Sequence, residues 1–222
     1  MISSSRSMLY RFLILYGLLY AGFGVQSPYL PILLDNRHLR PETIALALAA
    51  GMAMRLMAAQ AVARLADRLD APKVFLALCT TAAALIGLGY LPAQGAWLLI
   101  AVGVLHSAAL APLPPLSDTL ALGAAAPAGS GGAVIHYGWL RGCGSAAFAL
   151  GLVLSGQVIG HFGIVVIVWL NAALLAAAAP MALGVPQLLA TGGHPRPRRA
   201  RLAGSECCCG CRSIARWFCS QC

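Results

Sequence analysis

The stretch of sequence that decides the fold spans residues 41–63 and reads PETIALALAAGMAMRLMAAQAVA. Proline suits the first turn of a helix, because its N–H is not needed there and its φ angle is already helical. From Ile44 to Ala63 the stretch contains a single charged residue, Arg55. A helix that crosses the hydrocarbon core of a bilayer needs about 20 predominantly apolar residues. The stretch therefore predicts a transmembrane helix from about Glu42 to Ala63 that carries one cation in its interior.

The composition of the whole chain extends this result. Of its 222 residues, 60% are hydrophobic and 9% are charged, and the mean hydropathy is +0.81. A typical soluble domain is about 25% charged, so this composition excludes a soluble globule. It also excludes disorder over most of the length, because disordered chains are poor in apolar residues. The apolar runs are about twice as long as the roughly ten-residue strands of membrane barrels and do not alternate. The sequence therefore predicts an all-α transmembrane fold.

Six apolar runs are long enough to be spans. Basic residues precede the first run, as in a signal peptide, but this run is longer than a signal-peptide core and leads into further spans, so we expect it to be retained. The chain then divides into an N-terminal segment (residues 1–11), a six-helix bundle (residues 12–186) and a tail (residues 187–222). The expected spans are Phe12–Leu34, Glu42–Ala63, Val74–Leu91, Ala96–Leu122, Ala133–Ile159 and Phe162–Val185.

The distribution of Lys and Arg predicts the orientation, because cytoplasmic loops are enriched in them. The loops on one side of the six spans carry only Arg37 and Arg40, whereas the side of the two termini carries the others. Both termini are therefore expected in the cytoplasm. Topology signals and an arginine-rich tail account for the net charge of +9, so no nucleic-acid partner is needed to explain it. The basic residues on the side of the termini, before the tail, are Arg6, Arg11, Arg64, Arg68 and Lys73.

Three charged residues lie inside the expected spans: Arg55, Asp118 and Arg141. A central charge costs about 2.5–3.5 kcal/mol on insertion scales, and such residues face a protein interior or a cavity. At about 1.5 Å per residue, both arginines lie about 12 Å and the aspartate about 6 Å from the side of the termini. We therefore expect all three to meet. Two interpretations stay open: a buried pair that locks helices together, and a path for a substrate or for protons, where the excess cation favours a small organic anion.

The spacing along the spans agrees with this placement. Arg55 lies in an i,i+4 row of small residues, which is typical of close helix packing, and Arg141 shares a polar row with Tyr137 and Ser145. His106 lies within the fourth span. A lone histidine there more often forms a helix–helix hydrogen bond than a proton relay, and we predict the hydrogen bond. The small row consists of Ala47, Gly51, Arg55, Ala59 and Ala63.

The loop between the second and third spans reads ARLADRLD (residues 63–70). It resembles the loop signature of the major facilitator superfamily, in which a small residue is followed by x-Leu-Ala-Asp-Arg-x-Gly. In that signature a carboxylate and an arginine at helix ends bias the cytoplasmic gate, so the resemblance implies that Asp67 and Arg68 are gate residues. Asp70 stands where the signature has glycine, which alters the tight turn.

Further segments resemble one branch of this superfamily, the phenylpropionate-permease-like transporters, which are related to lactose permease and nucleoside–proton symporters. Trp139 stands where this branch commonly has a basic residue, and Cys143 where it commonly has tryptophan. These departures bear on the substrate more than on the fold. The similar segments are residues 27–31, 39–44, 111–118 and 137–145.

The resemblance implies a six-helix bundle equivalent to the N-terminal half of a twelve-helix transporter in the bacterial inner membrane, in which substrate binds between two halves that rock against each other. The implied activity is secondary active, proton-coupled uptake of a small organic acid, a 3-phenylpropionate-like aromatic carboxylate. The implied partners are this anion, protons, the lipid bilayer, and a missing C-terminal half or a second copy. No enzyme motif and no cofactor motif is present in the sequence. The implied substrate or proton-coupling residues are Arg55, Asp118 and Arg141, with Tyr137 and Tyr29 at the cavity wall.

The tail differs from the rest of the chain, since residues 187–222 hold six of the eight cysteines and six of the fifteen basic residues. Its crowded cysteine spacing, without histidine among the cysteines, does not favour a metal site, and a cytoplasmic location argues against structural disulfides. We expect a tail that is disordered or derived from a frameshift. The alternative function is accordingly a truncated, transport-inactive membrane fragment or a six-helix interaction protein.

Overall fold

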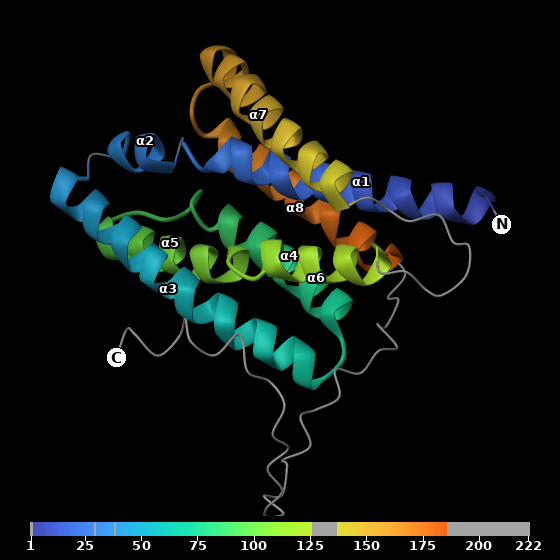
Figure 1. The fold of residues 1–222 in the computed structure, drawn as a ribbon. Coiled ribbons are helices and arrows are strands. Elements are labelled where there is room, and N and C mark those ends of the chain that lie inside the picture. The colour runs from blue at the N-terminus through green and yellow to red at the C-terminus, as the bar shows by residue number, and fades with distance from the viewer. Residues whose placement is uncertain (1, 29, 38, 126–136, 186–222) are drawn as a thin grey trace, which may run out of the picture. The chain divides into compact units, whose positions relative to one another are not determined.

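The computed structural model describes residues 2–28, 30–37, 39–125 and 137–185, which form helices joined by short turns (Figure 1). No strand occurs within these residues. The chain divides into two units, Met1–Leu189 and Ala190–Cys222; every described residue belongs to the first, and the expected tail lies outside the described residues. The helices are α1 (Ile2–Gln26), α2 (Leu30–Asp35), α3 (Pro41–Arg68), α4 (Pro72–Leu88), α5 (Ala96–Leu110), α6 (Leu113–Ala125), α7 (Tyr137–Phe162) and α8 (Val166–Gly184).

The prediction of an all-α bundle with six spans is confirmed, although two of the spans are each built from two helices. The first span consists of α1 and α2, which separate around Pro28, and the fourth consists of α5 and α6, which separate at Ala111 and Pro112. Proline has no N–H to continue a helical hydrogen-bond ladder, which explains both breaks. Within the part of the chain that the structure describes, five stretches are long and apolar enough to cross a membrane, and α4, with 17 residues, is the shorter sixth.

Most of the expected bounds differ from the observed ones by a few residues, but α1 begins at Ile2, ten residues before the expected Phe12. The third span begins at Pro72 and ends at Leu88, because turns at residues 89–92 follow it. The sixth begins at Val166 rather than Phe162, because Gly163 has a φ of +80°. That left-handed conformation, which glycine adopts at little cost, ends α7 and turns the chain into α8. The expected start of the fifth span, at residue 133, lies outside the described residues.

Two glycines allow α1 and α7 to cross at backbone contact. A Cβ atom on Gly24 of α1 would lie 2.2 Å from the carbonyl oxygen of Phe148 on α7, and one on Gly151 of α7 would lie 2.6 Å from the carbonyl oxygen of Ala21. Neither position can accept a larger residue without separating the helices. Small residues at crossings of this kind are a general feature of helix packing in membranes. The crossing brings the aromatic face of α1 against α7.

The remaining helices pack against α1 or against the helices that contact it. α8 packs against α1 and α4, and α3 packs against α5. One face of α1 supplies the centre of the main hydrophobic cluster, and α4, α6, α7 and α8 each contribute to it. The fully buried large side chains of this cluster include Phe12, Leu15, Tyr16, Leu19, Leu76, Leu113, Leu140 and Leu175.

Arginine side chains tie helices together at both ends of the bundle. At the end that contains the α3–α4 turn, Arg11 donates a hydrogen bond of 2.8 Å to the carbonyl oxygen of Gly184, the last residue of α8. At the opposite end, Arg37 donates to the carbonyl oxygens of Tyr90, Leu91 and Ala93 after α4. These donors satisfy carbonyl groups that have no partner inside a helix.

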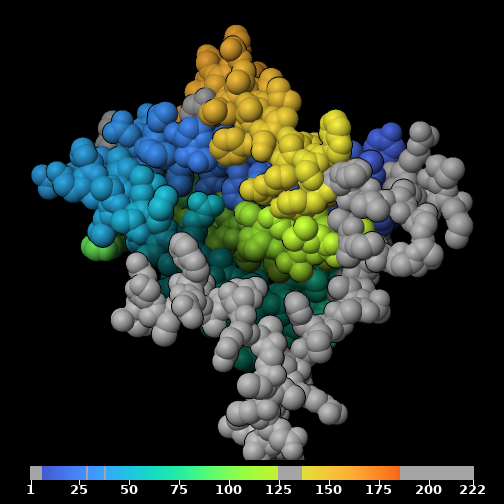
Figure 2. Space-filling model, viewed as in Figure 1, coloured from blue at the N-terminus to red at the C-terminus, as the bar shows by residue number. Residues whose placement is uncertain are grey.

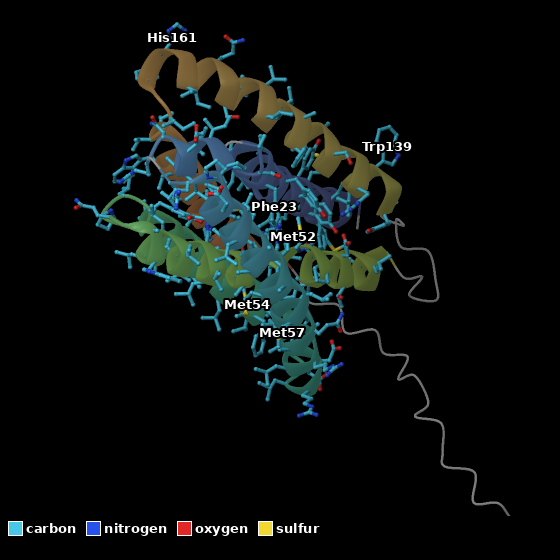
Figure 3. The ribbon with its side chains drawn as sticks, turned by 90° about the vertical axis from the view of Figure 1, so that its left-hand side faces the viewer. Phe23, Met52, Met54, Met57, Trp139 and His161 are labelled. Atoms are coloured by element: carbon cyan, nitrogen blue, oxygen red, sulfur yellow. The ribbon has the colours of Figure 1, made fainter. Side chains whose placement is uncertain are left out.

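The helices α3 and α7 carry the least buried surfaces. Only 11% of the apolar window of α3 and 17% of that of α7 are buried, compared with 39% for α8. In Figure 2 the end of α7 drawn in orange projects beyond its neighbours, whereas the part drawn in yellow lies against them. Figure 3 shows Met52, Met54 and Met57 along α3, with Trp139 and His161 near opposite ends of α7. These apolar surfaces face either lipid or another protein.

Candidate functional site

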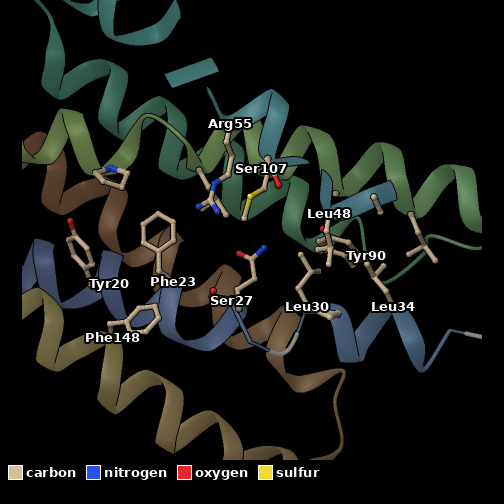
Figure 4. Close-up of a pocket in the computed structure, with 18 residues that line it drawn as sticks. Tyr20, Phe23, Ser27, Leu30, Leu34, Leu48, Arg55, Tyr90, Ser107 and Phe148 are labelled. Carbon is tan, nitrogen blue, oxygen red and sulfur yellow. The ribbon is translucent and has the colours of Figure 1, made fainter. Parts of the chain in front are cut away.

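A cavity of about 460 Å³ lies between α1, α2, α3, α5 and α7 (Figure 4). Its wall is mainly apolar and includes the aromatic rings of Tyr20, Phe23 and Phe148. Ser27 and Ser107 add polar groups from α1's C-terminal turn and from α5. Small-molecule sites in proteins have this size and this composition, with few polar groups in an apolar wall.

Arg55 is the charged residue in this wall. Its guanidinium carbon lies 5.9 Å from the centre of the Phe23 ring, a cation–π distance. Among the described residues no carboxylate forms an ion pair with it, since the one ion pair there joins two other residues. The small row on α3 has the predicted role in part: Ala47 and Gly51 are buried, and a Cβ on Gly51 would lie 2.9 Å from Ser107 Oγ. The row thus packs on α5 and directs Arg55 to the cavity.

A second polar cluster joins α1, α6 and α7. The Tyr16 hydroxyl donates a hydrogen bond of 2.7 Å to Asp118 Oδ1, and an Arg141 nitrogen lies 3.7 Å from Asp118 Oδ2. Arg141 also donates to the hydroxyl of Tyr20, and its guanidinium carbon lies 5.2 Å from the centre of that ring. Tyr137 interacts with the same carboxylate. The cluster is a cation and an anion surrounded by three tyrosines.

The expectation that three charged residues meet is therefore fulfilled for two of them. Asp118 and Arg141 pair, and their side chains are 27% and 49% exposed, while Arg55 lies apart on the cavity wall. Tyr20 connects the two places, because it lines the cavity and also contacts Arg141. The three charged residues thus form an ion pair, Asp118 with Arg141, and a separate cation, Arg55. Tyr20 lies between the pair and the cavity that Arg55 lines.

The predicted gate residues lie at the end of α3. The side chains of Asp67 and Arg68 are both exposed, and no described residue forms an ion pair with either. Asp70, which replaces the glycine of the signature, keeps a left-handed φ of 48°. Aspartate tolerates this conformation better than most residues, so the tight turn persists without glycine. Tyr29, predicted at the cavity wall, lies outside the described residues.

Sequence reasoning missed the contribution of α1. Tyr16, Tyr20 and Phe23 recur at i, i+4 and i+7, a spacing that places them on one helix face, and this face meets both Arg55 and Asp118. The rings of Tyr16 and Tyr20 stack with centroids 5.6 Å apart. The spacing was a usable signal. The partners of these rings were not readable from it, because they come from α3, α6 and α7.

His106 on α5 forms the predicted helix–helix hydrogen bond. Its Nδ1 atom lies 3.2 Å from the amide nitrogen of Gln26 on α1. Asn171 on α8 makes a similar link, since its amide nitrogen donates to the carbonyl oxygen of Gly22 on α1 over 2.9 Å. Within the described residues no group of three or more His, Cys, Asp and Glu side chains could hold a metal ion.

Five of the described stretches are long and apolar enough to cross a membrane, and the helices enclose a cavity with a charged side chain in its wall, which is typical of a multi-pass membrane protein. The chain matches the model of the MFS_1 like family over residues 9–195. It therefore belongs to this family of the major facilitator superfamily, and this membership supports a role in transmembrane transport. No curated protein and no solved structure matched the chain.

Proposed function

We propose that this chain mediates secondary active uptake of a small organic acid, an aromatic carboxylate of the 3-phenylpropionate type. The observation that carries the proposal is Arg55, a cation on the wall of the cavity with no carboxylate partner among the described residues. A carboxylate bound to this guanidinium would form the strong, charge-assisted hydrogen bonds that arginine makes with planar anions. It would also neutralise a charge that is expensive at membrane depth.

The rest of the wall fits an aromatic group. Phe23, Tyr20 and Phe148 line the cavity together, on one side of Arg55, as Figure 4 shows. Aromatic rings prefer offset or edge-to-face contact with one another, which adds about 0.5–1.5 kcal/mol to the burial of their area. A ligand with a ring and a carboxylate a few bonds apart can contact both the aromatic side chains and the cation. This separation of groups favours an arylalkanoate over a small inorganic anion.

Asp118 is the proposed proton-coupling residue. It is a carboxylate at membrane depth whose partners, Tyr16 and Arg141, are arranged around its two oxygens. Intramembrane carboxylates are common in proton relays. The competing interpretation is that Asp118 and Arg141 only lock α6 to α7. The position of Tyr20 favours proton coupling, because Tyr20 contacts Arg141 and also lines the cavity.

Alternating access requires a second helical unit opposite the cavity. Arg55 is exposed on α3 and Arg141 on α7, so the opening between these helices contains cations that lipid would solvate poorly. We propose that a second six-helix half, or a second copy of this chain, covers that face and that the two rock about the cavity. Asp67 and Arg68 are the proposed gate residues on the cytoplasmic side of a bacterial inner membrane, where both termini would lie.

The test measures equilibrium binding of labelled 3-phenylpropionate to the purified full chain in detergent. Arg55→Gln is expected to weaken binding at least tenfold, since a charge-assisted hydrogen bond is lost. Arg64→Gln, which removes an exposed arginine of α3 outside the cavity wall, is the matched control and should leave affinity unchanged. Equal affinity of the Arg55→Gln variant and the wild type would overturn the proposal. Binding by the reconstituted chain without uptake down a pH gradient would support the inactive fragment instead.

A further inference from the structure

A second, much smaller cavity lies behind the first. Its volume is about 10 Å³, and residues of α1, α2, α4, α5 and α8 line it, together with Tyr90. A single water molecule requires a cavity of about this size, provided that two to four polar groups surround it. Gln26 and Tyr90 line both cavities, so they form the partition between them.

The hydrogen bond between Gln26 and His106 fixes where the imidazole hydrogen lies. The Gln26 amide nitrogen can only donate, and it lies 3.2 Å from His106 Nδ1, so Nδ1 accepts. In an imidazole whose Nδ1 accepts, the ring hydrogen is on Nε2, which is then a donor. His106 is 2% exposed and Gln26 is 9% exposed. The pair therefore presents one buried donor, His106 Nε2–H, and one buried acceptor, Gln26 Oε1.

These groups have no partner among the described residues. Gln26 Oε1, His106 Nε2 and the Tyr90 hydroxyl are all buried, and none of them forms a hydrogen bond there. All three residues line the small cavity. A buried polar group without a partner costs about 1–3 kcal/mol, and three at one place would be an unusual loss. One water molecule can accept from two groups and donate to a third, which is the complement of the two donors and one acceptor here.

We propose that the small cavity is a binding site for a single water molecule, which accepts hydrogen bonds from His106 Nε2 and the Tyr90 hydroxyl and donates one to Gln26 Oε1. The water and His106 together hold the Gln26 amide in place at the wall of the larger cavity. His106 is thus a positioning residue, because it lines only the small cavity. This second part rests on the proposed function of the larger cavity, whereas the water site itself does not.

The water site is tested by thermal unfolding of the full chain in detergent. Tyr90→Phe removes one hydroxyl and leaves the volume of the ring. If a water molecule occupies the site, the variant loses a hydrogen bond, and Tm is expected to fall by about 2–4 °C for a chain of this size. If the cavity is dry, the variant removes an unsatisfied hydroxyl, and an unchanged or raised Tm would overturn the proposal. Tyr10→Phe, at an exposed tyrosine, is the control and should not change Tm.

Gly87→Ala provides a second measurement, because Gly87 lines the small cavity and a Cβ there would lie 3.3 Å from His106 Nε2. The added methyl group would take the place of the water. Since both variants remove the same molecule, their effects on Tm should be clearly less than additive in the double variant Gly87→Ala/Tyr90→Phe. Additive losses would contradict a shared water.

The positioning role is tested by the affinity for labelled 3-phenylpropionate well below Tm. His106→Leu is expected to weaken binding about tenfold, because Gln26 loses its support. Thr80→Val removes a buried hydroxyl that bonds only to its own helix and should lower stability without changing affinity. Unchanged affinity in His106→Leu would refute the positioning role. If the wild type itself binds no 3-phenylpropionate, the proposed function fails and the positioning role with it, while the unfolding measurements still decide the water site.

Discussion

The hydroxyl of Tyr16 on α1 donates a hydrogen bond of 2.7 Å to the carboxylate of Asp118 on α6, although 102 positions separate the two residues. Tyr16 is fully buried, and its removal leaves Asp118 Oδ1 without this donor. Hydrogen bonds to charged groups contribute about 1.5–3 kcal/mol. Tyr16→Phe is therefore expected to lower Tm by several degrees in detergent. Tyr10→Phe should have no effect, and a Tyr16→Phe variant as stable as wild type would show that the bond contributes nothing.

Variants of the ion pair between Asp118 and Arg141 can distinguish proton coupling by Asp118 from a purely structural link between α6 and α7. Asp118→Asn leaves Arg141 without its carboxylate, so both interpretations predict a loss of stability. The double variant Asp118→Asn/Arg141→Gln should regain much of it, because no unpaired charge remains.

The two interpretations differ in transport. If Asp118 carries the proton, Asp118→Asn abolishes uptake of 3-phenylpropionate driven by a pH gradient but retains exchange of labelled for unlabelled substrate. Both rates can be measured in the same proteoliposomes. Gradient-driven uptake by this variant at the wild-type rate would leave the pair a purely structural role.

The crossing of α1 and α7 gives a prediction about glycine. Gly24→Ala would place a Cβ 2.2 Å from the Phe148 carbonyl oxygen, so the helices must separate and Tm should fall by several degrees, the equivalent of about 1–3 kcal/mol of overpacking. Gly142→Ala on α7 meets no atom within 4 Å and should gain stability through the higher helix propensity of alanine. A Gly24→Ala variant at least as stable as Gly142→Ala would contradict the close crossing.

The turn after α3 gives a prediction about backbone conformation. Asp70 has a φ of 48°. This left-handed conformation costs about 1–2 kcal/mol for a residue with a Cβ atom, and more for a β-branched residue. Asp70→Val is expected to lower Tm, and Asp70→Gly, which has no Cβ, should fold with the same turn. Circular dichroism during heating measures both. Equal Tm values for the valine and glycine variants would show that the turn relaxes out of the left-handed region.

Much of the bundle was predictable because hydrophobic length alone defines a span. Residues 41–63, for example, could only be a helix through the membrane. The pairing of Asp118 with Arg141 was also within reach, since depth and charge both bring them together. The positions of helix breaks were less accessible, and the left-handed Gly163 moved the start of α8.

The lateral packing was not predictable, because it depends on which faces meet across helices far apart in sequence. Gly138 and Gly142 form a small-residue row on α7, yet neither meets another atom within 4 Å; Gly144 and Gly151 make the contacts with α1 instead. Arg55 was expected beside Asp118, but it lies apart from Asp118, because α3 packs on α5. Depth follows from counting residues, whereas rotation about a helix axis is decided by all its neighbours together.

Tyr20 links the wall of the cavity to the ion pair between Asp118 and Arg141. Its ring forms part of the wall where a ligand would sit, and its hydroxyl accepts from Arg141, the partner of Asp118. A molecule that displaces this ring therefore changes the surroundings of the carboxylate. Binding free energies are reciprocal, so if Asp118 carries a proton as proposed, a ligand that changes the proton affinity of Asp118 has its own affinity changed to the same extent by that proton. In that case the side chain of Tyr20 would couple protonation of Asp118 to the affinity of the cavity for its substrate.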